Sequence, residues 1–141
     1  MRQIKYILID EASNENRGRN GRHIRLPNVG HHYVVNSKGL VSNPVDIRTP
    51  VHVIDGKMDP DGYNANSVVV RLGSGFKVQG SKCLEPEMWN LKQRDALKNL
   101  LVELRSHFPE AMIFGIREIG DYFIKVSDEM NELRLELSEL D

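Results

Sequence analysis

The segment at residues 62–73 constrains the fold of this 141-residue chain more than any other. It reads GYNANSVVVRLG, a polar stretch joined to three consecutive valines and closed by a glycine. A run of β-branched residues suits a buried strand better than a surface helix. The segment therefore predicts a polar loop feeding a central strand. Tyr63, Asn64 and Asn66 lie at the strand's entry, where side-chain amides can shape a turn or hold a ligand.

Length and composition favour a single domain. With 141 residues and 40% hydrophobic content, the chain can build one core but hardly two. Its net charge of -1 provides no basic field, so neither nucleic acid nor an anionic membrane is an expected partner. A local cluster of four arginines is either a solvated face or a site for a phosphate or carboxylate: Arg17, Arg19, Arg22 and Arg25.

Cysteine content and the amino-terminal sequence indicate the compartment. Cys83 is the only cysteine, so no disulfide framework and no zinc-finger spacing exists, and we expect it to be an ordinary small apolar residue. The first residues contain an apolar run too short for a signal peptide or a membrane span. We therefore expect a cytoplasmic protein, with export by other routes left open.

Apolar runs separated by turn residues predict the amino-terminal half. Residues 4–9 form a first strand ending at two carboxylates, Asp10 and Glu11, and residues 13–28 form a loop. Residues 30–36 and 40–42 make a hairpin through a tight turn at 37–39. His31 and His32 should point to opposite faces of that strand. His52 falls in an irregular, proline-containing connection at residues 43–62.

Helical periodicity dominates the carboxyl-terminal half. Residues 85–87 should open a long helix whose apolar stripe runs from Met88 to Phe108, followed by a last strand at residues 111–116. Ser127 is then the expected N-cap of a terminal helix with an apolar seam: Met130, Leu133, Leu137 and Leu140. This helix either docks on its own domain or pairs with another chain. We therefore expect one domain at residues 1–126, with residues 127–141 as its C-terminal helix.

This order of elements resembles the zinc-dependent N-acetylmuramoyl-L-alanine amidases, especially their phage-lysozyme and peptidoglycan-recognition branch. The similarity spans residues 4–118, and three segments carry it: GHHYVV at 30–35, His52 followed by GYNANS at 62–67, and LRSHFP at 104–109. The resemblance implies an α/β fold of the α+β type, with a central mixed β-sheet and a long helix packed on it. It also implies a groove for peptidoglycan, in which His52, Tyr63, Asn64 and Asn66 are candidate ligand-binding residues.

The same resemblance places the family's three zinc ligands on residues that do not form the usual site. The first ligand histidine corresponds to Asp10, the second to Ile116 and the third ligand to Ile124, while the assisting tyrosine corresponds to His31. A carboxylate can bind zinc, but isoleucine cannot. We therefore expect no metal and no cofactor. A rewired site with Asp10, His31 and a loop residue such as His23 remains an alternative.

Three hypotheses follow for the function. The first is a metal-free, amidase-like domain, without catalysis, that binds peptidoglycan fragments or a protein partner. The second is an active amidase with a rewired metal site, in which Asp10 and His31 are the catalytic residues. The third is a structural or regulatory component, of phage or mobile-element origin, that assembles as a homo-oligomer through the terminal helix. Fold does not decide between them.

Overall fold

The computed structural model describes residues 2–11, 29–73, 89–119 and 126–140, and the backbone of residues 78–79 and 82–83. The predicted loop at 13–28, the four clustered arginines, His23, the predicted helix start at 85–88 and Ile124 lie outside this description. The elements are β1 (Tyr6–Glu11), β2 (Tyr33–Val35), β3 (Val41–Ser42), η1 (Gly56–Met58), α1 (Tyr63–Asn66), β4 (Ser67–Leu72), β5 (Val78–Gln79), β6 (Lys82–Cys83), α2 (Leu91–His107), β7 (Met112–Gly115), η2 (Ile116–Glu118) and α3 (Asp128–Glu139).

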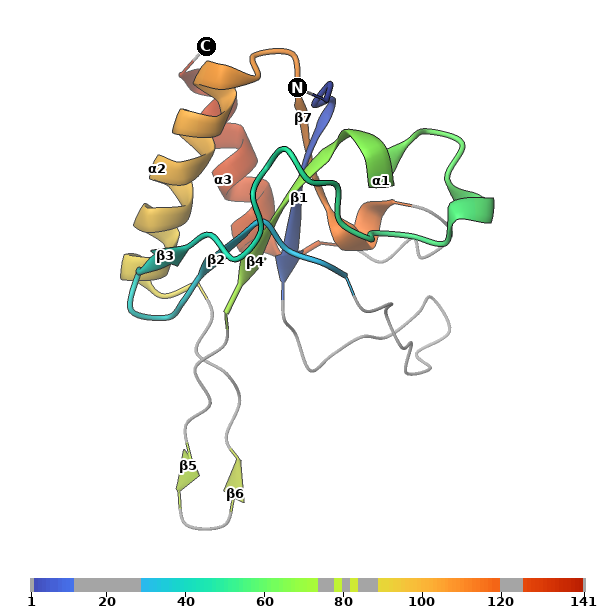
Figure 1. The fold of residues 1–141 in the computed structure, drawn as a ribbon. Helices are drawn as coiled ribbons and strands as arrows, with labels where there is room; N and C mark the ends of the chain where they lie inside the picture. Colours follow the sequence, from blue (N-terminus) through green and yellow to red (C-terminus); the bar gives the residue numbers. More distant parts are fainter. Residues whose placement is uncertain are drawn as a thin grey trace.

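Five strands form one mixed sheet in the order β3-β2-β4-β1-β7 (Figure 1). The valine-rich strand β4 is central, with β1 and β2 parallel to it on its two sides. Parallel strands are usually covered on both faces and need continuous apolar runs, which β1 and β4 supply. Ile9 lies opposite both Val70 and Gly115, which fixes the register of the three inner strands. The predicted central mixed sheet is confirmed.

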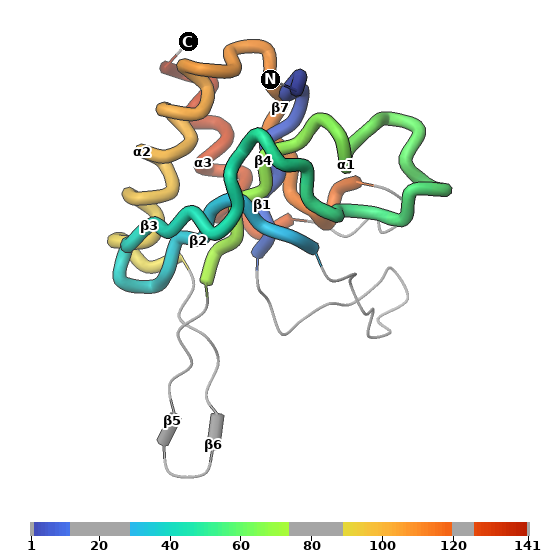
Figure 2. The backbone as a smooth tube through the Cα atoms, viewed as in Figure 1, coloured from blue at the N-terminus to red at the C-terminus, as the bar shows by residue number. Residues whose placement is uncertain are grey.

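Helices α2 and α3 pack against one face of the sheet (Figure 2). Alternate residues of β1 and β4 point to this face, as the two-residue period of a strand requires. They meet the predicted apolar stripe of α2 and the seam of α3 in one continuous core: Ile7, Ile9, Val68, Val70, Leu97, Leu100, Leu101, Leu104, Met130, Leu133 and Leu137. The long helix therefore packs on the sheet as predicted.

Among the described residues, no long helix covers the opposite face of the sheet. Tyr6, Leu8 and Val69 point to this side and contact the connection at residues 43–62, through Val53, and the short helix η2. The ring centroid of Tyr6 lies 4.6 Å from that of Tyr63. Asp10 has the same parity along β1 as Tyr6 and Leu8, so it emerges on this side.

Helix α2 begins later than the sequence predicts. Its N-cap is Asn90, whose side chain accepts a hydrogen bond from the backbone N of Gln93 at 2.9 Å. The residue before it, Trp89, has a φ of 62°, a left-handed conformation that interrupts any helix running through it. Leu91 is consequently in the first turn and exposed, so its predicted place on the buried stripe is wrong.

The entry to β4 is also more ordered than predicted. Residues 63–66 form one helical turn, α1, where the sequence predicts a loop. Gly62 precedes the turn with a φ of 76°. The Asp59 carboxylate accepts hydrogen bonds from the backbone N atoms of Tyr63, at 2.7 Å, and Asn64, at 3.0 Å. Asp59, four positions before Tyr63, therefore stabilises the start of this helical turn. The sequence does not predict the turn because the valines that follow it favour a strand.

The remaining strands differ from the predictions mainly at their ends. β1 begins at Tyr6 and includes the two carboxylates, β2 begins only at Tyr33, and the last strand ends at Gly115 because Ile116 already belongs to η2. The tight turn at 37–39 is confirmed by Gly39, whose φ of 81° suits glycine. Residues 78–79 and 82–83, in a predicted loop, pair as a separate two-stranded sheet.

The terminal helix α3 docks on its own chain. Ser127 is its N-cap, and its hydroxyl accepts a hydrogen bond from the backbone N of Met130 at 3.1 Å. Glu136 joins α3 to α2 through Arg94 at 2.5 Å and Lys98 at 3.2 Å. Three of the four seam residues are buried in the shared core, whereas Leu140 is 62% exposed. Pairing of this seam with another chain was the alternative to docking on the same domain, and the seam is largely buried within this chain.

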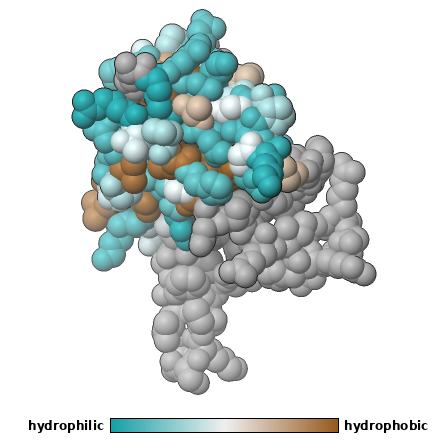
Figure 3. Space-filling model, turned by 45° about the vertical axis from the view of Figure 1, so that its right-hand side comes forward, coloured by the Kyte–Doolittle hydropathy of each residue, from teal (hydrophilic) through white to brown (hydrophobic). Residues whose placement is uncertain are grey.

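The described surface is mainly hydrophilic. In the view of Figure 3, hydrophobic side chains gather in small groups among hydrophilic ones. Within the described residues, no helix combines the length and the apolar character needed to cross a membrane.

Candidate functional site

Two of the predicted site residues, Asp10 and His31, form a pair near the end of β1. The Nε2 atom of His31 lies 2.8 Å from Oδ2 of Asp10, and the two side chains are 15% and 17% exposed. A pair of this kind can exchange or hold a proton, or supply two ligands to a cation. The structure therefore brings together the two residues proposed as catalytic. Whether they act in catalysis stays a prediction.

The sheet explains how residues 21 positions apart meet. Tyr33 at the start of β2 and Ile9 of β1 both lie opposite Val70 of the intervening strand β4. His31 therefore approaches Asp10 across β4. Gly30 makes this path possible, because a Cβ at this position would lie 2.7 Å from the Cβ of Val51.

Ile116 is the residue that the sequence resemblance aligns with the second zinc ligand of the amidases. Gly115 pairs with Ile9, so Asp10 follows this pair within β1, and Ile116 follows it as the first residue of η2. Ile116 is only 2% exposed and packs with Tyr6, Leu8 and other apolar residues. The position that the resemblance assigns to the second ligand thus carries a buried hydrocarbon side chain.

The donor set can be compared with the needs of zinc. A catalytic zinc takes three protein ligands and keeps one open position. Across residues 2–11, 29–73, 89–119 and 126–140, no three His, Cys, Asp or Glu side chains come together as a possible metal site. The described residues therefore offer zinc only the Asp10–His31 pair, which does not fit the ion's usual coordination.

Arg117 and Glu118, which follow Ile116 in η2, differ in their contacts. The Glu118 carboxylate accepts a hydrogen bond from the backbone N of Gly115 at 2.8 Å and pairs with Arg134 of α3 at 2.7 Å. The side-chain atoms Nε and Nη2 of Arg117 are buried with no hydrogen-bond partner among the described residues. Glu118 thus fixes the turn after β7 and links it to α3.

The sequence does not identify Glu11 as a residue that joins several elements of the fold. It is 4% exposed, and its Oε1 accepts hydrogen bonds from Trp89 Nε1, at 2.8 Å, and from the hydroxyl of Ser127. Trp89 precedes α2 and Ser127 caps α3, so this one carboxylate joins the end of β1 to the starts of both helices. The adjacent acids at a strand end were a signal, but nothing local identified these partners.

Two of the predicted ligand-binding residues have structural contacts. The Oδ1 atom of Asn64 accepts hydrogen bonds from the backbone N atoms of Val53, at 2.7 Å, and Ile54, at 3.0 Å, and its Nδ2 donates to the Ile54 carbonyl at 2.7 Å. Asn66 donates to the Gln3 carbonyl at 2.9 Å. Both amides therefore hold loops to the sheet, which was one of the two roles expected for them.

The other two predicted ligand-binding residues differ in exposure. His52 is exposed, and its backbone carbonyl accepts a hydrogen bond from Gly30 N at 2.8 Å. Tyr63 is half-buried against Tyr6, and burial raises the pKa of its phenol. The backbone contact of His52 holds the glycine that precedes His31. A ligand-binding role for either side chain remains a prediction.

His32 is fully buried, whereas its neighbour His31 is partly exposed, and the contacts of His32 are structural. Its Nδ1 accepts a hydrogen bond from Val69 N at 3.0 Å, so its Nε2 carries the proton and donates to the Thr49 carbonyl at 2.7 Å. Arg2 Nη2 lies 3.1 Å from this Nε2 and donates instead to the Ser67 carbonyl at 2.7 Å. Burial, assisted by the charge of Arg2, lowers the pKa of His32.

Comparison with known proteins supports the fold. No protein-family model and no curated protein sequence matches the chain. Among solved structures, it is similar to the N-acetylmuramoyl-L-alanine amidase LysC from Clostridium intestinale, with a TM-score of 0.62 and 11% identity over 96% of this chain and 87% of LysC. It is also similar to the Ph2119 endolysin of a Thermus scotoductus bacteriophage, with a TM-score of 0.56 and 17% identity over 89% and 81% of the two chains.

A third similar structure contains a ligand. It is AmpDh3 from Pseudomonas aeruginosa in complex with anhydromuramic pentapeptide, with a TM-score of 0.58 and 12% identity. The match covers 93% of this chain but only 60% of AmpDh3. At these identities the similarity concerns the fold. The chain therefore has the mixed-sheet fold of the N-acetylmuramoyl-L-alanine amidases.

Proposed function

We propose that this chain is an amidase-fold protein that binds peptidoglycan fragments near Asp10 and His31 without zinc-dependent hydrolysis. Support for the ligand class comes from the fold and from the anhydromuramic pentapeptide bound to one similar structure. The Asp10–His31 pair, partly exposed beside the end of β1, provides a hydrogen-bonding surface for a polar ligand. A peptidoglycan fragment supplies the hydroxyl, amide and carboxylate groups that such a surface recognises.

The proposed loss of zinc chemistry is supported by one observation. Ile116 lies in an apolar cluster at the position where a second ligand would be needed, next to Asp10. An apolar neighbour removes a ligand and disfavours a dication together with its bound water. The two remaining donors already satisfy each other at 2.8 Å.

The direct test measures metal, turnover and binding in the full chain. Elemental analysis of protein purified without added metal or chelator is expected to find no stoichiometric zinc, and a muramyl peptide is expected to stay intact. Calorimetry should detect binding of the anhydromuramic pentapeptide, weakened by His31→Ala. His107→Ala, which removes an exposed histidine at the end of α2, is the matched control. Failure of the unmodified protein to bind the peptide would refute the proposal.

The Asp10–His31 pair also favours a second candidate, an active amidase with a rewired metal site. Both side chains are of ligand type and lie within hydrogen-bonding distance. This candidate predicts chelator-sensitive cleavage of the amide between muramic acid and L-alanine. Asp10→Ala should then remove metal and activity together. Activity that persists in this variant would exclude the second candidate.

A further inference from the structure

Arg71 lies next to Asp10 on the face of the sheet that carries the Asp10–His31 pair. It is the second-last residue of β4, and the register of the parallel strands places it directly opposite Asp10. Register partners on parallel strands point to the same face, and Val69, which has the same parity as Arg71, packs with Leu8 on that face. A half-buried cationic side chain therefore belongs to the candidate site, although the sequence does not single it out.

The guanidinium group of Arg71 forms no ion pair or hydrogen bond with a described residue. Asp10 pairs with His31 instead, whose Nε2 lies 2.8 Å from the Oδ2 atom of Asp10. A guanidinium carries five N–H donors in a planar fork and stays charged in proteins. Arg71 therefore brings unused donors to a place where the neighbouring carboxylate is already engaged.

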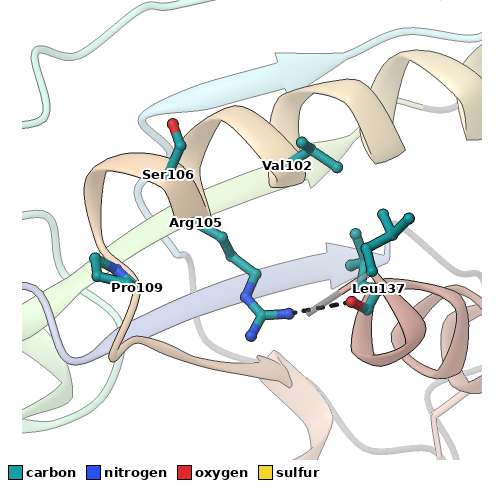
Figure 4. Close-up of a pocket in the computed structure, with 6 residues that line it drawn as sticks. Val102, Arg105, Ser106, Pro109 and Leu137 are labelled. Carbon is teal, nitrogen blue, oxygen red and sulfur yellow. Dashed lines mark hydrogen bonds between the residues drawn. The ribbon is translucent and has the colours of Figure 1, made fainter.

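Arginines on the helix-covered side of the sheet differ from Arg71, because they link elements of the fold. Arg134 of α3 pairs with Glu118 of η2 at 2.7 Å. In a hollow of about 230 Å³ lined by residues of α2 and α3, Arg105 donates to the Leu137 carbonyl at 3.5 Å (Figure 4). Among the described residues Arg71 has no such link, so its side chain is not accounted for by the architecture.

The carboxyl ends of the parallel strands β1, β4 and β7 meet at the edge of the sheet where Arg71 lies. Ligands of open α/β sheets bind outside these strand ends. Arg117 in η2 follows β7 at this edge, and its buried Nε and Nη2 atoms have no hydrogen-bond partner among the described residues. The carboxylate of Glu11, in contrast, accepts hydrogen bonds from Trp89 and Ser127. This edge thus combines unused guanidinium donors with engaged carboxylate acceptors, which complements an anionic group.

We propose that Arg71 binds a carboxylate of the bound peptidoglycan fragment, beside the Asp10–His31 pair. This contact rests on the function proposed above and specifies which part of the fragment the site recognises, an acidic group of its peptide. A guanidinium and a carboxylate form two parallel hydrogen bonds, which orient the ligand and add to its affinity. The site then prefers a fragment with free carboxylates to its amidated form.

The test compares two ligands by calorimetry on the full chain: the anhydromuramic pentapeptide and the same compound with its carboxylates converted to primary amides. The original chain should bind the free-acid form about tenfold or more tightly, the usual scale for hydrogen bonds to a charged group. Arg71→Gln should remove this preference by weakening the binding of the free-acid form alone. Arg71→Lys, which keeps the charge without the planar fork, should retain part of the preference.

Two controls accompany these variants. Lys92→Gln removes one positive charge from an exposed position on α2, on the other side of the sheet, and should leave both affinities unchanged. A second readout needs no variant: the Nε–H signal of Arg71 in NMR spectra of the original chain should shift when the free-acid form is added and stay in place with the amide.

The possible results distinguish the carboxylate contact from the function on which it rests. If the original chain binds neither ligand, the proposed function fails and the contact fails with it. If both ligands bind equally and Arg71→Gln has no effect, fragment binding stands and the carboxylate contact is refuted. If Arg71→Gln weakens both ligands to the same extent, Arg71 positions the Asp10–His31 pair, and the carboxylate contact is again refuted. A preference that persists in Arg71→Gln would assign it to another residue.

Discussion

Asp10 and Glu11 are adjacent carboxylates at the end of one strand, yet their side chains lie on opposite faces of the sheet and have different contacts. On the helix-covered face, Glu11 is buried and accepts hydrogen bonds from residues that begin α2 and α3. On the other face, Asp10 is partly exposed and, among the described residues, pairs with His31. The alternation of a strand therefore buries one acid among the helix starts and leaves the other partly exposed on the opposite face.

This difference shows how the site could change while the fold was maintained. The architectural contacts of Glu11 and Glu118 fix the strand ends and the helix starts from within the structure. Among the described residues, the face around Asp10 has no comparable contacts to the two helices, and the apolar Ile116 packs there with Tyr6 and Leu8. Substitution at Ile116 can alter chemistry without releasing α2 or α3.

The largest expected effect comes from Glu11→Ala. It leaves the indole N–H of Trp89 and the N-cap Ser127 without their buried acceptor. We expect the free energy of unfolding to fall by about 3 kcal/mol, in the range for breaking a buried charged network. Urea denaturation measures it, with the tryptophan fluorescence of Trp89 as the signal. Glu103→Ala, at an exposed helix position, is the control, and equal losses in the two variants would contradict the argument.

Ile116→His tests the face of the sheet that carries Asp10 and His31. An imidazole in the apolar cluster around Ile116 lacks a partner, so we expect a loss of about 2 kcal/mol without metal. It also adds a third donor next to Asp10 and His31, so zinc should raise the thermal midpoint of this variant and not that of the original chain. Ile116→Val, which stays apolar, is the control. A midpoint that zinc leaves unchanged would show that the imidazole cannot join the pair.

The main elements of this fold were predictable because their signals are local. The valines of β4, the stripe of α2 from Leu97 to Leu104 and the Ser127 cap each depend on neighbouring residues. The start of α2 was not, because it is set by the left-handed Trp89, whose indole contacts Glu11 78 positions earlier in the chain. A contact between residues so far apart produces no periodic pattern in the sequence.

The candidate site was predicted only in part for the same reason. Asp10 and His31 were identified as candidates from strand ends and motif position, and the structure places them in contact. That Asn64 and Asn66 hold loops could be stated only as an alternative, since their acceptors and donors come from other elements. The sequence does not distinguish an asparagine whose amide shapes a loop from one whose amide binds a ligand.

The buried neutral His32 predicts how stability depends on pH. Its folded pKa lies below the unfolded value of about 6.5, so below that pH the unfolded chain binds a proton that the folded chain does not. Stability should fall as pH drops through about 6.5, by at most about 1.4 kcal/mol per pH unit. Arg2 and His31 oppose protonation, and Asp46 favours it.

The measurement compares urea unfolding between about pH 7.5 and pH 5.5 in the original chain and in His32→Asn. The variant has no imidazole at this position, so its pH dependence in this window should be flatter. A slope equal to that of the original chain would assign the effect to other groups.

The smallest expected effect on stability is that of Asp10→Ala, which distinguishes Asp10 from its neighbour Glu11. Its pair with His31 is partly exposed, and solvent screens such a pair, so Asp10→Ala should change the free energy of unfolding by less than about 1 kcal/mol. The same variant should nevertheless weaken binding of the anhydromuramic pentapeptide. Asp46→Ala provides the exposed control: Arg48 lowers the pKa of Asp46 to about 2, but both groups lie at the surface, so neither stability nor binding should change. A stability loss at Asp10 as large as that at Glu11 would mean that both carboxylates are architectural, and the binding surface would then have to be sought elsewhere.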